Sequence, residues 1–128
     1  MAFTGKILLI DDEPHVRKYV GLLARGLGTP VIIEADNGEK ALALYEQESP
    51  DLVLLDVNLP GMDGLQILAA ILALDPDAVV IMLTSLANRQ TIEECLRLGA
   101  TSYIRKDTPK EVVFAELSAV VAENLKYT

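Results

Sequence analysis

The sequence contains little of several residue types, and each scarcity excludes a class of protein. The single cysteine, Cys95, cannot form a disulfide within the chain, so nothing indicates a disulfide-stapled fold or an oxidising compartment. Lysine and arginine number 11 against 19 acidic residues, and the net charge of −8 argues against a general nucleic-acid binder. Aromatic residues make up 5% of a chain that is 51% hydrophobic, which indicates an aliphatic interior.

Long hydrophobic runs are also missing. The apolar run after Lys6 is too short to span a bilayer and ends in three acidic residues. The first residues lack the cationic region and long apolar segment of a secretion signal. We therefore expect a cytoplasmic protein without membrane association, and the length of 128 residues predicts one domain over residues 1–128.

The sequence does contain five short apolar runs, each followed by apolar residues at helical spacing. The predicted strands are residues 6–10, 31–33, 52–56, 79–83 and 102–104. Helix-start signals follow at Pro14, at Asn37 or Asp36, and at Asp63, Asn88 and Pro109. Five such βα units predict an α/β fold with a parallel sheet and helices on both faces. In the fourth helix, we expect Ile92, Cys95 and Leu96 to face inward, with Cys95 as buried filler.

Three of the predicted strands end at polar residues. The run of residues 52–55 leads into Asp56, the first strand leads into Asp11 and Asp12, and the fourth leads into Thr84 and Ser85. Ligands of open α/β sheets bind at the carboxyl ends of the strands. We therefore expect these side chains to form one site.

The acidic residues of this site predict a metal ion. Asp11, Asp12 and Asp56 would repel one another unless a cation binds or a pKa rises. With no histidine or cysteine nearby, the oxygen ligands suit a hard cation such as Mg²⁺, which also lets an anionic phosphoryl group approach a carboxylate. Lys106, just past the fifth strand, could pair with phosphoryl oxygens, and the Thr84 hydroxyl could donate to one of them.

Taken together, these residues resemble a known family across essentially the whole chain. The chain is similar to the receiver domains of two-component response regulators, of which the single-domain chemotaxis receiver is one. The resemblance implies a flavodoxin-like, doubly wound, five-stranded sheet in the order 2-1-3-4-5 with five helices. The residues that carry it are Asp11-Asp12, Asp56 in the run Leu-Leu-Asp-Val-Asn-Leu-Pro-Gly-Met-Asp-Gly, Thr84-Ser85, Tyr103 and Lys106.

The resemblance implies a role for each residue around the phosphorylation site. Asp56 would accept a phosphoryl group from a sensor histidine kinase or a phosphotransfer protein. Asp12 and Asp56 would bind Mg²⁺ directly and Asp11 through water, and the backbone carbonyl of Asn58 would be a further ligand. Lys106 would contact the phosphoryl group. Such a domain catalyses only its own phosphoryl transfer and dephosphorylation, so it is not otherwise an enzyme.

The resemblance also implies a switch. Thr84 would move toward the phosphoryl group, and Tyr103 would swing inward into the space that Thr84 leaves. This motion would change the face formed by the fourth helix, fifth strand and fifth helix, which would contact a downstream protein. We expect no direct contact with nucleic acid or membrane, and phosphorylation-dependent dimerisation is left open.

Two positions depart from the family pattern. The family usually has proline after the lysine, in a cis peptide bond, whereas Asp107 follows Lys106 here. Because a non-proline cis bond costs about 3–4 kcal/mol, we expect either a trans bond with a rearranged loop or a strained cis bond. We expect the Asp107 side chain to face solvent.

The second departure is Leu86, two residues after Thr84, where relatives often carry a polar residue. With Asn58, its side chain would flank the path of an attacking water, which an apolar group cannot orient. We predict slow self-dephosphorylation and a shorter phosphate lifetime in Leu86→Glu. An unchanged lifetime in that variant would contradict the idea.

Other functions compete with the phosphorylation switch. The chain could be a pseudo-receiver that binds a partner constitutively, or the receiver part of a longer regulator. A Mg²⁺-dependent phosphatase ranks last, because such enzymes usually need a second acid two residues after the nucleophile, where this chain has Asn58. The cationic side chains of the second half are expected to be a solvated surface, with a contact patch for an acidic partner as the alternative.

Overall fold

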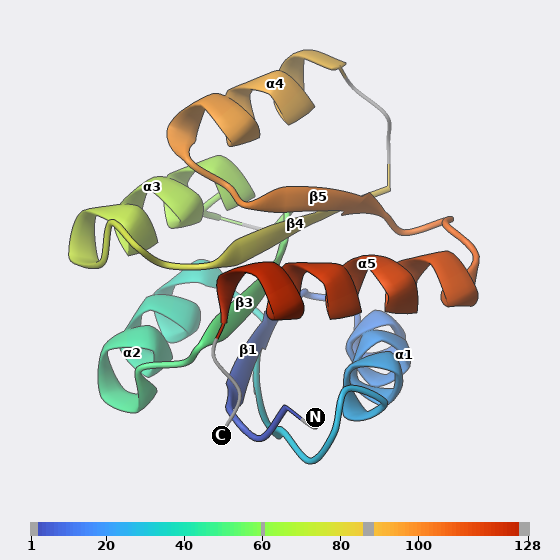
Figure 1. Ribbon diagram of the computed structural model, residues 1–128. Coiled ribbons are helices and arrows are strands. Elements are labelled where there is room, and N and C mark those ends of the chain that lie inside the picture. Colours follow the sequence, from blue (N-terminus) through green and yellow to red (C-terminus); the bar gives the residue numbers. More distant parts are fainter. Residues whose placement is uncertain (1–2, 60, 86–88, 126–128) are drawn as a thin grey trace.

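The computed structural model describes residues 3–59, 61–85 and 89–125 and shows a three-layer α/β fold (Figure 1). Its sheet has five parallel strands in the order β2-β1-β3-β4-β5, which confirms the predicted architecture and strand order. The strands are β1 (Lys6–Ile10), β2 (Val31–Ala35), β3 (Leu52–Asp56), β4 (Val80–Thr84) and β5 (Ser102–Arg105). The helices are α1 (Pro14–Arg25), α2 (Gly38–Glu48), α3 (Gly64–Leu74), α4 (Arg89–Leu98) and α5 (Lys110–Asn124).

The core has two halves, one on each face of the sheet. Helices α1 and α5 cover one face, and α2, α3 and α4 cover the other (Figure 1). Successive strand residues alternate between the faces: Leu9 and Leu54 belong to the cluster under α1 and α5, while Leu8 and Leu55 belong to the opposite cluster. Because β1, β3 and β4 are buried on both faces, their sequences are continuous apolar runs.

Polar side chains fix the starts of two helices where the sequence predicted caps. The Asn37 side chain accepts a hydrogen bond from the backbone N–H of Lys40 at the start of α2. Asp63 caps α3 in a reciprocal capping box with Gln66. The cap predicted at Asn88 lies outside the described residues.

One prediction about the core is wrong. Leu96 was expected to face inward beside Cys95, but its side chain is 44% exposed, whereas Cys95 is buried. Consecutive helical residues point about 100° apart, so the narrow stripe of α4 that meets the sheet accommodates Cys95 and leaves Leu96 outside. Among the described residues, no helix is both long and apolar enough to cross a bilayer.

Candidate functional site

Three carboxylates meet at the carboxyl edge of the sheet. Asp11 directly follows β1, and Asp56 is the last residue of the adjacent strand β3. Both side chains are buried, with 0% and 2% exposure, while Asp12 is exposed. One oxygen from each of Asp11, Asp12 and Asp56 lies within 4.8 Å of the others. The structure therefore brings together the three acids that strand-end placement predicted.

Lys106 supplies the positive charge of this cluster. Its Nζ lies 2.8 Å from Oδ2 of Asp11 and 3.2 Å from Oδ2 of Asp56. The lysine is held at the end of β5, where its backbone N–H donates to the carbonyl of Thr84 over 2.7 Å. Lys106 has a third acidic neighbour that sequence reasoning missed. It is Glu13, whose Oε1 lies 3.6 Å from the same Nζ. Its position directly after Asp11-Asp12 was the only signal for it.

The cluster perturbs two pKa values. Burial, and then the charge of Asp11, raise the pKa of Asp56 to about 6, against the opposing effects of Lys106 and of the Asn58 backbone N–H. That N–H donates to Oδ1 of Asp56 over 3.1 Å. Burial lowers the pKa of Lys106, but its hydrogen bond with Asp11 and the charges of Asp56 and Asp11 outweigh burial and raise it overall. The cluster thus makes Asp56 easier to protonate than an ordinary carboxyl group, while holding Lys106 charged.

The residues fit a divalent cation that prefers oxygen ligands. The three carboxylates would carry three negative charges when ionised, against one positive charge on Lys106. Two charges remain unbalanced in a largely buried place, and Mg²⁺ would neutralise them. Asn58 lies beside the cluster through its backbone bond to Asp56.

Comparison with known proteins decides the family. The family model described as "Response regulator receiver domain" matches residues 7–118. The chain belongs to this family. It is a response regulator receiver domain of two-component signalling.

Similar proteins include single-domain and longer regulators. The chain is 36% identical to the chemotaxis protein CheY of Listeria monocytogenes over 79% of this chain and 85% of that protein. It is also 36% identical to a putative transcriptional regulator of Pseudomonas aeruginosa over 92% of this chain, but it spans only 57% of that relative. A CheY-like receiver structure from Methanospirillum hungatei is 25% identical, covers 95% of this chain and 97% of its own, and superposes with a TM-score of 0.86. The CheX–CheY–BeF3–Mg²⁺ complex from Borrelia burgdorferi contains a chain that is 31% identical, covers 94% of this chain and 90% of its own, and gives a TM-score of 0.84.

The two predicted switch residues of the receiver differ in environment. Thr84 is buried at the end of β4, opposite Arg105 of β5, and its carbonyl holds the backbone of Lys106. Tyr103, on β5, is 38% exposed. The structure therefore joins Thr84 to the acidic cluster through Lys106 and places Tyr103 at the surface.

The loop after β5 contains the departure at Asp107. The described residues contain no cis peptide bond, so Lys106 and Asp107 are joined in trans, which was the first of the two alternatives. A turn closes here, with the Thr108 backbone N–H donating to the Arg105 carbonyl. As expected, Asp107 faces solvent. The sequence did not predict its bidentate ion pair with Arg105, whose Nε and Nη2 lie 3.0 and 2.8 Å from the carboxylate oxygens. Leu86 lies outside the described residues.

Removing the charge of Lys106 should strengthen Mg²⁺ binding. In Lys106→Met, the acidic cluster would lose the ammonium group that occupies Oδ2 of Asp11 and Oδ2 of Asp56 and that repels a metal ion. We expect the Mg²⁺ affinity to rise on the order of tenfold at pH 7. Isothermal titration calorimetry measures the Mg²⁺ affinity. The control is Lys110→Met, which removes the same charge at the exposed start of α5. An equal change in both variants would mean that net charge alone is responsible.

Proposed function

We propose that this receiver accepts a phosphoryl group on Asp56 in a Mg²⁺-dependent reaction and thereby controls a partner protein. The observation that carries the proposal is the placement of the Asp56 carboxylate. It is buried at the end of a central strand, with Oδ1 held by the Asn58 N–H and Oδ2 facing Lys106. An incoming phosphoryl group would therefore meet a fixed nucleophile and a cation that is already in position.

The reaction would be a phosphoryl transfer from a phosphohistidine of a sensor histidine kinase or phosphotransfer protein. A carboxylate oxygen of Asp56 attacks the phosphorus, the bond between phosphorus and the donor's imidazole nitrogen breaks, and the imidazole leaves with the electron pair. Lys106 stays within reach of the transferred oxygens and balances their charge. Asp11, Asp12, Asp56 and the carbonyl of Asn58 would hold Mg²⁺, which neutralises the charge that develops on the phosphoryl group.

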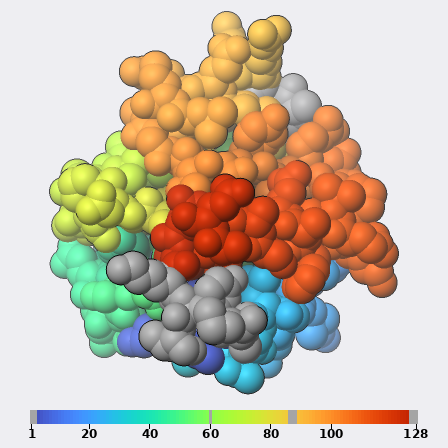
Figure 2. Space-filling model, in the orientation of Figure 1, coloured from blue at the N-terminus to red at the C-terminus, as the bar shows by residue number. Residues whose placement is uncertain are grey.

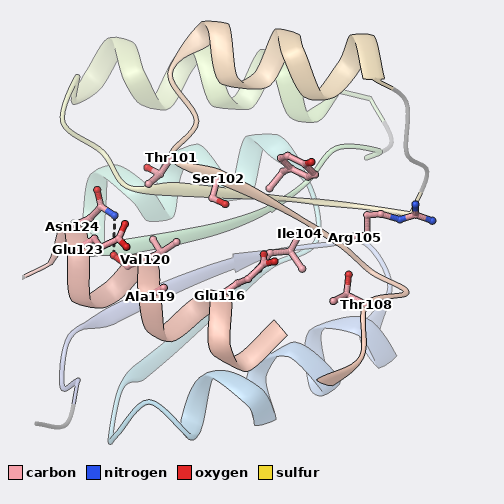
Figure 3. Close-up of a pocket in the computed structure, with 11 residues that line it drawn as sticks. Thr101, Ser102, Ile104, Arg105, Thr108, Glu116, Ala119, Val120, Glu123 and Asn124 are labelled. Atoms are coloured by element: carbon pink, nitrogen blue, oxygen red, sulfur yellow. Dashed lines mark hydrogen bonds between the residues drawn. The ribbon is translucent and has the colours of Figure 1, made fainter. Parts of the chain in front are cut away.

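The output would pass through the face made by α4, β5 and α5. Phosphorylation would draw Thr84 toward Asp56 and let Tyr103 leave the surface for the interior. Helices α4 and α5 are prominent on the face seen in Figure 2. A groove of about 530 Å³ lies within this face between β5 and α5, and its lining includes Ser102 of β5, Thr108 of the following loop, and Glu116 and Glu123 of α5 (Figure 3). A downstream protein would bind this face. The receiver domain would extend over residues 1–128, and it would act in the cytoplasm.

Intact mass spectrometry tests the proposal. The receiver is incubated with acetyl phosphate, with and without Mg²⁺. We expect one added phosphate only when Mg²⁺ is present, none in Asp56→Asn, and a normal adduct in Asp77→Asn, which changes an exposed acid away from the cluster. A folded protein that neither gains phosphate nor forms a stable beryllofluoride complex would instead be a pseudo-receiver.

A further inference from the structure

A second surface, on the opposite edge of the sheet from β5, has features of a binding site. The outward side of α1 and the edge strand β2 enclose a groove of about 400 Å³. Its lining consists of Arg17, Lys18, Gly21, Leu22, Arg25, Ile32 and Glu34. None of these residues belongs to the acidic cluster or to the α4-β5-α5 face.

The charge of this groove is opposite to that of the chain. The protein carries a net charge of −8, yet the groove has three cationic side chains and one acid. The acid, Glu34, is already paired, because Nε of Arg17 lies 2.9 Å from its Oε1. Arg17 is also tied inward, since its Nη1 donates to the carbonyl of Asp11. The charges of Arg17 and Glu34 therefore offset each other, and the positive charge left for a ligand belongs to Lys18 and Arg25.

Lys18 and Arg25 differ from the arginines of α4 and β5. Each of Arg89, Arg97 and Arg105 forms an ion pair with an acid of its own segment. Neither Lys18 nor Arg25 has an ion pair with any residue in the three stretches that the structure describes, and both are exposed. A carboxylate from another molecule could approach either of them without displacing an existing partner.

An apolar side chain lies between these two cations. Leu22 is four residues after Lys18 and three before Arg25, so the three share one face of α1. Its side chain is 62% exposed, and the half-buried Ile32 of β2 lies in the same groove. A single exposed leucine is ordinary. Leu22, however, lies in a concave surface between two unpaired cations, and an apolar centre with a charged rim is typical of protein–protein interfaces.

The geometry points to a docking site for an acidic segment of a partner protein that carries a large apolar side chain. Its carboxylates would pair with Lys18 and Arg25, and its apolar side chain would pack on Leu22 and Ile32. Charge complementarity selects this occupant, since the excess positive charge is local to the groove. An anionic membrane is disfavoured, because a flat surface would not enter the groove and would repel a protein of net charge −8. This site does not depend on the phosphorylation of Asp56.

The test uses a displayed library of random 12-residue peptides, selected against the whole folded receiver. We expect selected peptides rich in Asp or Glu with at least one Leu, Ile or Phe. Their amide shift perturbations in the labelled receiver should lie on residues 17–25 and 31–35. The charge reversal Lys18→Glu with Arg25→Glu should weaken binding at least tenfold. Lys40→Glu with Lys110→Glu, which makes the same change in net charge on α2 and α5, should leave binding within twofold.

Several results would overturn the proposal. They are an absence of enriched peptides from the folded protein, peptides that map elsewhere, or equal losses in the two reversal variants. If the receiver bound phosphatidylserine vesicles and the double variant Lys18→Glu with Arg25→Glu did not, the surface would instead bind a membrane. A concentration-dependent dimer lost in the same variant would assign it to a second copy of the chain. Circular dichroism of both double variants establishes that each is folded.

Discussion

Asp56→Asn should make the receiver more stable at pH 7 when no divalent cation is present. Burial and the neighbouring Asp11 raise the pKa of Asp56 from 3.8 to about 6, so ionising it in the folded protein costs free energy. Two pKa units correspond to about 3 kcal/mol, which sets the upper size of the effect. Asparagine keeps the shape of the side chain without the charge, and we expect the free energy of unfolding to rise by about 1–3 kcal/mol.

The pH dependence gives this prediction a sign that can be checked. Because the folded-state pKa lies above the unfolded value, the folded protein binds more protons between pH 4 and 6, and the stability of the parent falls as pH rises through that window. The variant lacks this loss. The two proteins should therefore be equally stable near pH 4 and differ fully above pH 6. Urea unfolding at several pH values in EDTA measures the difference, with Asp77→Asn as the exposed control.

Mg²⁺ should reverse the order of stability, so that the parent becomes more stable than Asp56→Asn. A ligand that binds only the folded state adds stability in proportion to the logarithm of its concentration over Kd, and Asp56 is one of its proposed ligands. Added Mg²⁺ should stabilise the parent much more than Asp56→Asn. If Asp56→Asn were instead less stable than the parent at pH 7 in EDTA, the pairing of Asp56 with Lys106 would outweigh the cost of burying its charge.

Much of this arrangement could be predicted because strand ends are easy to locate. The apolar runs before Asp11, Asp56 and Thr84 mark strands that are buried on both faces, and parallel topology then brings their ends to one edge. The order of the strands came from the family resemblance, because apolar periodicity gives no information about which strands are neighbours.

The contacts that could not be predicted all depend on how far a side chain or loop reaches. Glu13 approaches Lys106, and Arg105 turns to Asp107, because the loops after β1 and β5 take particular paths. Leu96 was wrongly predicted to face inward, because the sequence pattern does not show how wide the buried face of α4 is. The close contact of Gly64 with β3 has no signal in the sequence either, because the nearby Gly61 is the same residue type and makes no such contact.

Gly64 lies at a close contact between the start of α3 and the end of β3. Its backbone N–H donates to the carbonyl of Val57 over 2.8 Å. A Cβ at this position would clash with the carbonyl oxygen of Asp56 and would lie 2.7 Å from Cα of Val57, and both atoms are backbone. Backbone cannot rotate away as a side chain can, so any larger residue at position 64 must push the strand end that carries Asp56.

Gly64→Ala should therefore destabilise the fold and displace the phosphorylation site, although alanine is the better helix former. We expect a loss of about 1–3 kcal/mol in the free energy of unfolding, and slower phosphorylation of Asp56 by acetyl phosphate. Gly21→Ala is the matched control, because Gly21 is also helical and buried, yet its nearest neighbour to a new Cβ is Leu9 Cδ2 at 4.0 Å. In Gly21→Ala the gain in helix propensity should dominate, and the free energy of unfolding should rise by at most about 1 kcal/mol. Urea unfolding and the rate of phosphate incorporation measure both variants. If both were equally stable, the helix would shift at little cost, and the close approach of Gly64 would not fix the position of Asp56.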